Sequence, residues 1–178
     1  MDLRLDLYPS AERGAYRLLV KAAPEGVASP AEIPEQSADL IDGGEDAPAA
    51  SGARSVALTF WTPSAVARTV AHRPGCVLYL YCYSAPDAEA LAAFDRRIGE
   101  EYTTFYASHG IYYSGLMRAE GAGLPPLAEL MAIEADSREA AERQLDLPLP
   151  ERIVAIEDEC RTLQDRQRSR YTLWLTPR

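Results

Sequence analysis

The segments after Gly75 follow one another in an order that few folds share. They are a tyrosine-rich strand at 76–83, an amphipathic helix at 86–108, strands at 111–119 and 127–135, two short helical segments and a last strand at 171–176. This β-α-β-β-α-β order predicts an α+β fold with a split βαβ, or ferredoxin-like, unit. Such a unit leaves one face of its sheet bare, so that face needs a cover.

The helix at 86–108 carries the clearest periodic signal in the chain. Its apolar side chains recur every three or four residues and predict one buried stripe: Leu91, Phe94, Ile98, Tyr102 and Phe105. Gly110 is expected to end the helix in the left-handed conformation. The charged residues Asp95, Arg96 and Arg97 are interpreted as the solvated face of the helix.

The first 75 residues predict a β-rich extension to this unit. Residues 1–23 alternate leucine with charge and contain a turn at 9–14, which indicates an N-terminal β-hairpin. Residues 24–52 hold few large apolar groups and are interpreted as an acidic mobile loop. Residues 53–75 are expected to supply a strand and a short helix that join the extension to a core domain at 76–178.

Charge and hydropathy patterning argue against several classes of protein. The formal net charge is -9, and residues 24–52 contribute seven acidic groups and no Lys or Arg. The remainder is nearly neutral and has no basic track, so nucleic acid is not expected as a partner. The chain has no apolar run of 18 residues and no basic segment leading into an apolar one at its start. Its three cysteines lack framework spacing, so we expect a cytoplasmic protein without membrane contact.

Tyrosine is concentrated in one part of the chain, since seven of the ten tyrosines fall between positions 79 and 113. Alternate residues of a strand share a face. The strand at 76–83 therefore has two unlike faces: Tyr79, Tyr81 and Tyr83 against Cys76, Leu78, Leu80 and Cys82. The aliphatic face suits packing beneath helices. The tyrosine face needs partners for its hydroxyls, either in a dimer interface or in a wet pocket that holds a flat aromatic ligand.

A strand, a long helix ending in glycine, a hairpin, a helix and a short C-terminal strand together resemble the dimeric α/β-barrel superfamily. The resemblance covers about residues 76–178, including the stretches 107–110 (Ala-Ser-His-Gly) and 169–175 (Ser-Arg-Tyr-Thr-Leu-Trp-Leu). Members include antibiotic-biosynthesis monooxygenases, EthD-like proteins, muconolactone isomerases and polyketide cyclases. The resemblance implies a homodimer in which two sheets pack face to face, helices lie outside, and each subunit holds one small-molecule pocket.

Candidate catalytic residues gather where the long helix meets the next strand. His109, at the helix end, is a candidate general acid/base, and the alternative is a surface histidine that caps the last carbonyls. Tyr113 follows on the next strand. Arg118 is a candidate for binding an enolate or carboxylate, and the alternative is an ion pair with Glu134 across the hairpin. The expected substrate-binding residues are Tyr79, Tyr81, Tyr102, Tyr106, Glu134 and Trp174.

Motifs for metals, nucleotides and activated serines do not occur in the sequence. There is no G-x-S-x-G, P-loop or G-x-G-x-x-G fingerprint, and the two histidines and three cysteines have no metal-ligand spacing. We therefore expect no metal and no cofactor. The resemblance implies a cofactor-independent monooxygenase, cyclase or isomerase that acts on a small aromatic or polyketide-like substrate by positioning and acid/base catalysis. The alternative is a non-catalytic small-molecule-binding or assembly protein of the same fold.

Overall fold

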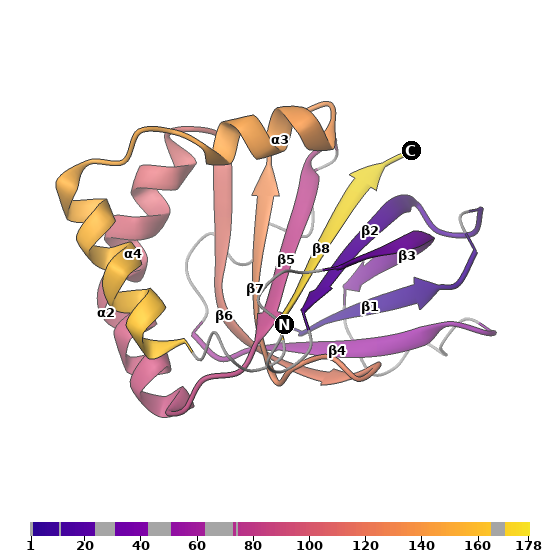
Figure 1. Ribbon diagram of the computed structural model, residues 1–178, viewed down its shortest axis with the longest axis horizontal. Helices are drawn as coiled ribbons and strands as arrows, with labels where there is room; N and C mark the ends of the chain where they lie inside the picture. Colours follow the sequence, from indigo (N-terminus) through magenta and orange to yellow (C-terminus); the bar gives the residue numbers. More distant parts are fainter. Residues whose placement is uncertain are drawn as a thin grey trace.

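Eight antiparallel strands close into a barrel within this single chain (Figure 1). The computed structural model describes residues 2–10, 12–23, 31–42, 51–62, 73, 75–164 and 170–178. The strands are β1 (Asp2–Tyr8), β2 (Tyr16–Ala23), β3 (Ala31–Asp42), β4 (Arg54–Phe60), β5 (Val77–Tyr83), β6 (Ile111–Gly121), β7 (Leu127–Ile133) and β8 (Arg170–Pro177). The helices are α2 (Ala88–Ala107), α3 (Arg138–Leu145) and α4 (Glu151–Leu163). Around the barrel the order is β1-β3-β2-β8-β5-β7-β6-β4, and β4 pairs with β1 to close it.

The predicted fold class, a ferredoxin-like unit in a dimeric α/β barrel, is wrong. The individual elements expected after Gly75 do lie close to their predicted positions. The sheet formed by β8, β5, β7 and β6, however, is completed by β1–β4 of the same chain and not by a second subunit. The N-terminal strands β1–β4 therefore form half of the barrel. They take the place that the sheet of a second subunit was expected to take.

The predicted N-terminal hairpin is also wrong, because β1 and β2 lie on opposite sides of β3. β1 pairs with 37–42 of β3 and β2 pairs with 31–38, so the end of β1 and the start of β2 meet at the same level. A short crossing over β3 connects them. Gly14 lies so close to β3 there that a Cβ atom would be 2.3 Å from the carbonyl oxygen of Ala38. Ser37 stabilises the crossing through two hydrogen bonds: its hydroxyl accepts one from the Gly14 N–H at 3.0 Å and donates one to the carbonyl oxygen of Ser10 at 2.7 Å.

The acidic segment expected to be a mobile loop contains β3. Residues 31–42 pair along both edges, and Ala38 is fully buried in the barrel. The register of the β2–β3 pairing shifts next to Pro34. This irregularity accommodates the proline, which has no N–H to donate to β2. The mobile-loop prediction is therefore wrong for 31–42. Residues 24–30 and 43–50, and the whole of the short helix expected at 63–71, lie outside the described residues.

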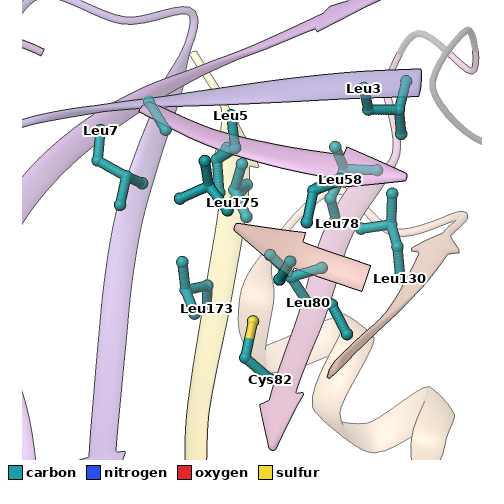
Figure 2. Packing of buried hydrophobic residues seen from close by; sticks show 14 of the residues in the cluster. Leu3, Leu5, Leu7, Leu58, Leu78, Leu80, Cys82, Leu130, Leu173 and Leu175 are labelled. Carbon is teal, nitrogen blue, oxygen red and sulfur yellow. The ribbon is translucent and has the colours of Figure 1, made fainter. Parts of the chain in front are cut away.

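The barrel interior is a packed aliphatic core (Figure 2). Leucines from five strands converge there: Leu3, Leu5, Leu7, Leu58, Leu78, Leu80, Leu130, Leu173 and Leu175. An eight-stranded barrel is just wide enough for its inward side chains to fill it. The inward face of β5 is the aliphatic one, with Cys82 beside the leucines.

A second core lies outside the barrel, where α2 and α4 cover β5, β6 and β7 (Figure 1). Tyr83, Trp174 and Phe94 are buried in it. The two faces of β5 are therefore reversed relative to the sequence prediction: the tyrosine face lies beneath the helices. The homodimer was predicted because this tyrosine face needed a cover. Helices of the same chain cover it, so the face no longer gives a reason to expect a homodimer, which stays a prediction.

Candidate functional site: a tyrosine-walled pocket

A pocket of about 540 Å³ opens between the outer face of the sheet and the helices α2 and α4. We call it the tyrosine pocket. Its lining residues are Tyr79, Tyr81, Tyr102, Tyr106, Glu129, Met131, Leu145, Leu149, Glu157, Cys160, Arg161, Gln164 and Arg170. Four of the six predicted substrate-binding residues, Tyr79, Tyr81, Tyr102 and Tyr106, are thus brought together here, from β5 and from the helix α2 that follows it.

Strand alternation places the sheet-side aromatic residues. Tyr79 lies opposite Trp174 in the β5–β8 pairing, and their ring centroids are 4.5 Å apart. Tyr81 and Tyr83 stack at 5.0 Å with an interplanar angle of 25°. Trp174 itself is only 5% exposed and packs beside Tyr79 on the neighbouring strand, so it supports the wall without lining the pocket.

The helix side of the pocket is fixed by Glu157 of α4. The hydroxyls of Tyr102 and Tyr106, one turn apart on α2, both donate to its Oε1, at 2.8 and 2.9 Å. Their rings lie 4.6 Å apart. Burial and the nearby Glu157 carboxylate raise the pKa of both phenols, so these tyrosines stay protonated and act as donors. The same contact joins α4 to α2.

Glu129 is the acidic group of the sheet wall. It faces Tyr81 in the β5–β7 pairing, and its Oε1 accepts a 2.5 Å hydrogen bond from the hydroxyl of Tyr83. Burial is the largest of the effects that together raise the pKa of Glu129 to about 8; the hydrogen bond from Tyr83 partly offsets the rise, and the nearby Asp95 and Glu157 carboxylates add to it. The carboxyl group is therefore mostly protonated at neutral pH, and it borders the pocket while carrying an exchangeable proton.

Asp95 was expected on the solvated face of α2, and this is wrong. It is 6% exposed and accepts hydrogen bonds from the Thr62 hydroxyl, the Leu116 N–H at 3.1 Å and the Tyr113 hydroxyl at 2.8 Å. Leu116 follows a bulge in β6 that shifts its pairing with β7. Asp95 therefore anchors α2 to the bulged strand.

Tyr113, a predicted catalytic residue, lies behind the pocket wall. It is 3% exposed, and its ring meets that of Tyr102 edge-on at 5.2 Å. Its hydroxyl is held by Asp95, and burial raises its pKa well above the usual value. Tyr113 therefore supports the pocket wall by packing against Tyr102 from the buried side.

His109 does not lie among the residues that line the tyrosine pocket. It is exposed at the end of α2, where its Nδ1 is 3.0 Å from the carbonyl oxygen of Phe105 and 3.0 Å from the hydroxyl of Ser108. Its ring packs at 4.8 Å from that of Phe105. The structure thus places it in the position of the alternative, a surface histidine at the last carbonyls of a helix.

Arg118 and Glu134 lie at opposite ends of the β6–β7 hairpin, so the predicted ion pair between them is wrong. The guanidinium of Arg118 stacks 4.0 Å from the ring centroid of Trp61. Glu134 instead accepts from Arg73 at 2.9 Å and from the Tyr112 hydroxyl at 2.8 Å, beside a second pocket of about 760 Å³. Neither residue lines the tyrosine pocket.

Sequence reasoning missed Glu129 and Glu157, the two acidic residues that line the pocket. For Glu129 a signal was present: in β7 the outward positions are Leu127, Glu129, Met131 and Ile133, and the glutamate is the single polar residue in the strand. A lone carboxyl in a strand that is apolar on both faces indicates a buried acid. Glu157 gave no comparable signal, because it precedes Asp158 and Glu159 on a polar helix surface.

Within the described residues, no group of three or more His, Cys, Asp or Glu side chains is placed to hold a metal ion. No helix in the described ranges has the length and apolar character needed to cross a membrane. No protein-family model matches the chain, and neither a curated protein nor a solved structure matches it. The tyrosine pocket therefore has to be interpreted from its own chemistry.

Proposed function

We propose that the chain binds a small aromatic molecule in the tyrosine pocket and that Glu129 exchanges a proton with it. The observation that carries the proposal is the position of Glu129, a carboxyl that borders a pocket with four tyrosines in its wall. The pocket volume of about 540 Å³ lies within the usual range for small-molecule sites. In this proposal the reaction is cofactor-independent, because Glu129 supplies the proton transfer and the aromatic walls supply positioning.

The aromatic walls favour a flat ligand. Tyr79 and Tyr81 come from the sheet, and Tyr102 and Tyr106 from α2. Rings on two sides allow stacked and edge-on contacts, each worth about 0.5–1.5 kcal/mol beyond the buried area. Because Glu157 holds both α2 hydroxyls, these two rings are preorganised before a ligand arrives.

Glu129 is suited to general acid/base catalysis at neutral pH. Such catalysis is most effective when the pKa of the group lies near the working pH, and burial brings the pKa of Glu129 to about 8. Tyr83 fixes the carboxyl through Oε1, which leaves Oε2 to carry the proton. A substrate that gains or loses a proton at a carbon or oxygen facing Oε2 is the one this arrangement serves.

A second candidate function is binding without catalysis. The observation that favours it is that the hydroxyls of Tyr102, Tyr106 and Tyr83 each already donate to a carboxyl group. Fully satisfied polar groups make a rigid wall that needs only a ligand of matching shape.

A two-stage experiment tests the proposal. A library of small aromatic compounds is screened by thermal shift, and each compound that binds is then assayed for turnover with the wild type and Glu129→Gln. General acid/base catalysis contributes about 10²–10⁴-fold, so Glu129→Gln should lose turnover by about that factor while still binding. Binding with no turnover in either protein supports the second candidate, and a screen in which no aromatic compound binds contradicts both.

A further inference from the structure

We propose that the ligand of the tyrosine pocket is an organic cation, an aromatic amine held as its ammonium between the tyrosine rings and the carboxyls of Glu129 and Glu157. This inference rests on the proposed small-molecule function of the pocket and names its ligand class. It goes further than that function, since an aromatic ligand need not carry a charge.

The first support is the combination of rings and carboxyls around one space. The wall holds four tyrosine rings, and Glu129 and Glu157 both line it. The face of an aromatic ring attracts a cation, by about 0.5–1 kcal/mol at exposed sites and about 2 when water is excluded. An ammonium group also donates three hydrogen bonds, which matches a site whose acidic members accept them.

The second support is the mutual repulsion of the acidic groups. Glu129 and Glu157 line the pocket and Asp95 is buried outside its lining, and both Asp95 and Glu157 disfavour ionisation of Glu129. The same three carboxylates disfavour ionisation of the Cys160 thiol at the pocket edge. A bound cation would relieve this repulsion and allow Glu129 to ionise, which is a specific gain that a neutral ligand cannot supply.

The arginines of the lining define the opposing possibility, an anionic ligand. Arg161 has a half-exposed side chain that bonds Asp158 at 3.1 Å and lies 3.9 Å from Glu157, so existing carboxylates already balance its charge. Arg170 also lines the pocket and has an interaction of its own. Arg161 lies one turn beyond Glu157 on α4 and Arg170 begins β8, whereas Glu129 lies in the middle of β7. This placement favours the cation at Glu129.

Cation binding at Glu129 has a proton balance that can be measured. The ammonium arrives already charged, Glu129 passes from carboxylic acid to carboxylate, and the released proton goes to the buffer. The ionisable groups that face Glu129 are Tyr79, Tyr81 and Tyr83 of β5, Asp95 and Tyr102 of α2, Tyr113 of β6, Glu157, Cys160 and Arg161 of α4, and Arg170 of β8. Burial raises the pKa values of the Tyr79, Tyr83, Tyr102 and Tyr113 phenols and of the Cys160 thiol, so these groups stay neutral and the proton comes from Glu129.

The test uses three probes of nearly equal shape: 2-phenylethylamine, 2-phenylethanol and phenylacetate. Isothermal titration calorimetry at pH 7, in phosphate and in Tris, measures both affinity and proton release. We expect the amine to bind at least about tenfold more tightly than the alcohol, with close to one proton released. Between pH 6 and 7 its affinity should rise about tenfold, because binding releases one proton and the tenfold lower proton concentration favours that release.

Two variants separate the outcomes. Glu129→Gln should abolish the proton release and the preference for the amine, whereas Glu159→Gln, on the exposed side of the same helix as Glu157, should change neither. If the alcohol or phenylacetate binds as tightly as the amine, or the amine binds without releasing a proton, the cation inference is overturned and the pocket function stands. If none of the three binds and the aromatic screen is also empty, both are overturned.

Discussion

Tyr83 donates a 2.5 Å hydrogen bond to Glu129 from the neighbouring strand, and this contact holds the acidic group of the tyrosine pocket in place. Tyr83 is 1% exposed, so its hydroxyl has no access to bulk water as an alternative partner. Tyr83→Phe should destabilise the fold by about 1–3 kcal/mol, because it leaves a buried carboxyl without its donor. Since the hydrogen bond from Tyr83 lowers the pKa of Glu129, the variant should also raise that pKa further.

Urea denaturation measures the first effect, and NMR titration of the Glu129 carboxyl carbon measures the second. Tyr171→Phe, at the partly buried start of β8, serves as the control and should cost less. A Glu129 pKa that falls in Tyr83→Phe would contradict the role assigned to this hydrogen bond.

Glu129 should give the protein a distinct dependence of stability on pH. Its pKa rises from about 4.5 to about 8 on folding, so the folded state holds this proton more tightly than the unfolded state does. The resulting stabilisation is fully present below pH 4.5 and is lost as the pH rises through 8. The free energy of unfolding of the wild type, relative to Glu129→Gln, should therefore fall between those values by at most about 1.4 kcal/mol per pH unit.

Chemical denaturation of both proteins at intervals across this range gives the difference directly. Groups common to both proteins cancel in the subtraction, and a flat difference would show that Glu129 ionises normally in the folded state.

His109→Gln should leave ligand binding and any turnover unchanged, because His109 is exposed at the end of α2 and does not line the tyrosine pocket. Its contacts are with the Phe105 carbonyl and the Ser108 hydroxyl, so the cost is confined to the helix end, at about 1 kcal/mol or less. The measurement is the affinity of whichever aromatic ligand the screen finds, with unfolding followed in parallel. A loss of turnover of about 100-fold at unchanged stability would contradict this prediction and show that His109 takes part in the reaction.

Local patterns in the sequence were sufficient to predict the elements after Gly75. The stripe of α2 and the alternation of β5 depend on residues close in sequence, and both are present. Which face of β5 points inward is not a local property. It depends on β1–β4, which close the barrel. In the closed barrel the aliphatic face of β5 packs in the interior, and the tyrosines lie outside, where the Tyr83 hydroxyl donates to the carboxyl group of Glu129.

The strand β3 was missed for a related reason. Its sequence contains Pro34, several acidic residues and few large apolar ones, so it has little strand signal of its own. Its stability comes from pairing on both edges with β1 and β2. Burial of Asp95 was also beyond local reasoning, since the donors that satisfy it, Thr62 and Leu116, come from distant segments.

The bulge in β6 should depend on the absence of a side chain at Gly115. Gly115 has φ +84°, and a Cβ atom there would lie 2.2 Å from the carbonyl oxygen of Thr62. Gly123 has φ +72° and nothing within 4 Å. Both Gly→Ala changes carry the left-handed backbone penalty of about 1–2 kcal/mol, but only Gly115→Ala adds a clash with the backbone of Thr62, the residue whose hydroxyl donates to Asp95.

We therefore expect Gly115→Ala to cost at least about 2 kcal/mol more than Gly123→Ala in urea denaturation. It should also weaken ligand binding, because α2 is anchored through Asp95 next to this bulge. Equal losses of stability in the two variants would mean that the close approach to Thr62 relaxes at little cost.

β3 should be essential for folding because it joins β1 to β2. Ala38 is fully buried in the barrel interior, while Ala31 at the start of the same strand is exposed. Ala38→Asp places a carboxylate among leucines, and an unpaired buried charge costs several kcal/mol, enough to unfold a typical domain of this size. Ala31→Asp adds the same charge at the surface and should change stability by about 0.5 kcal/mol or less. Circular dichroism and thermal unfolding of the two variants compare these effects, and a cooperative transition of Ala38→Asp near that of the wild type would contradict the place of 31–42 in the barrel.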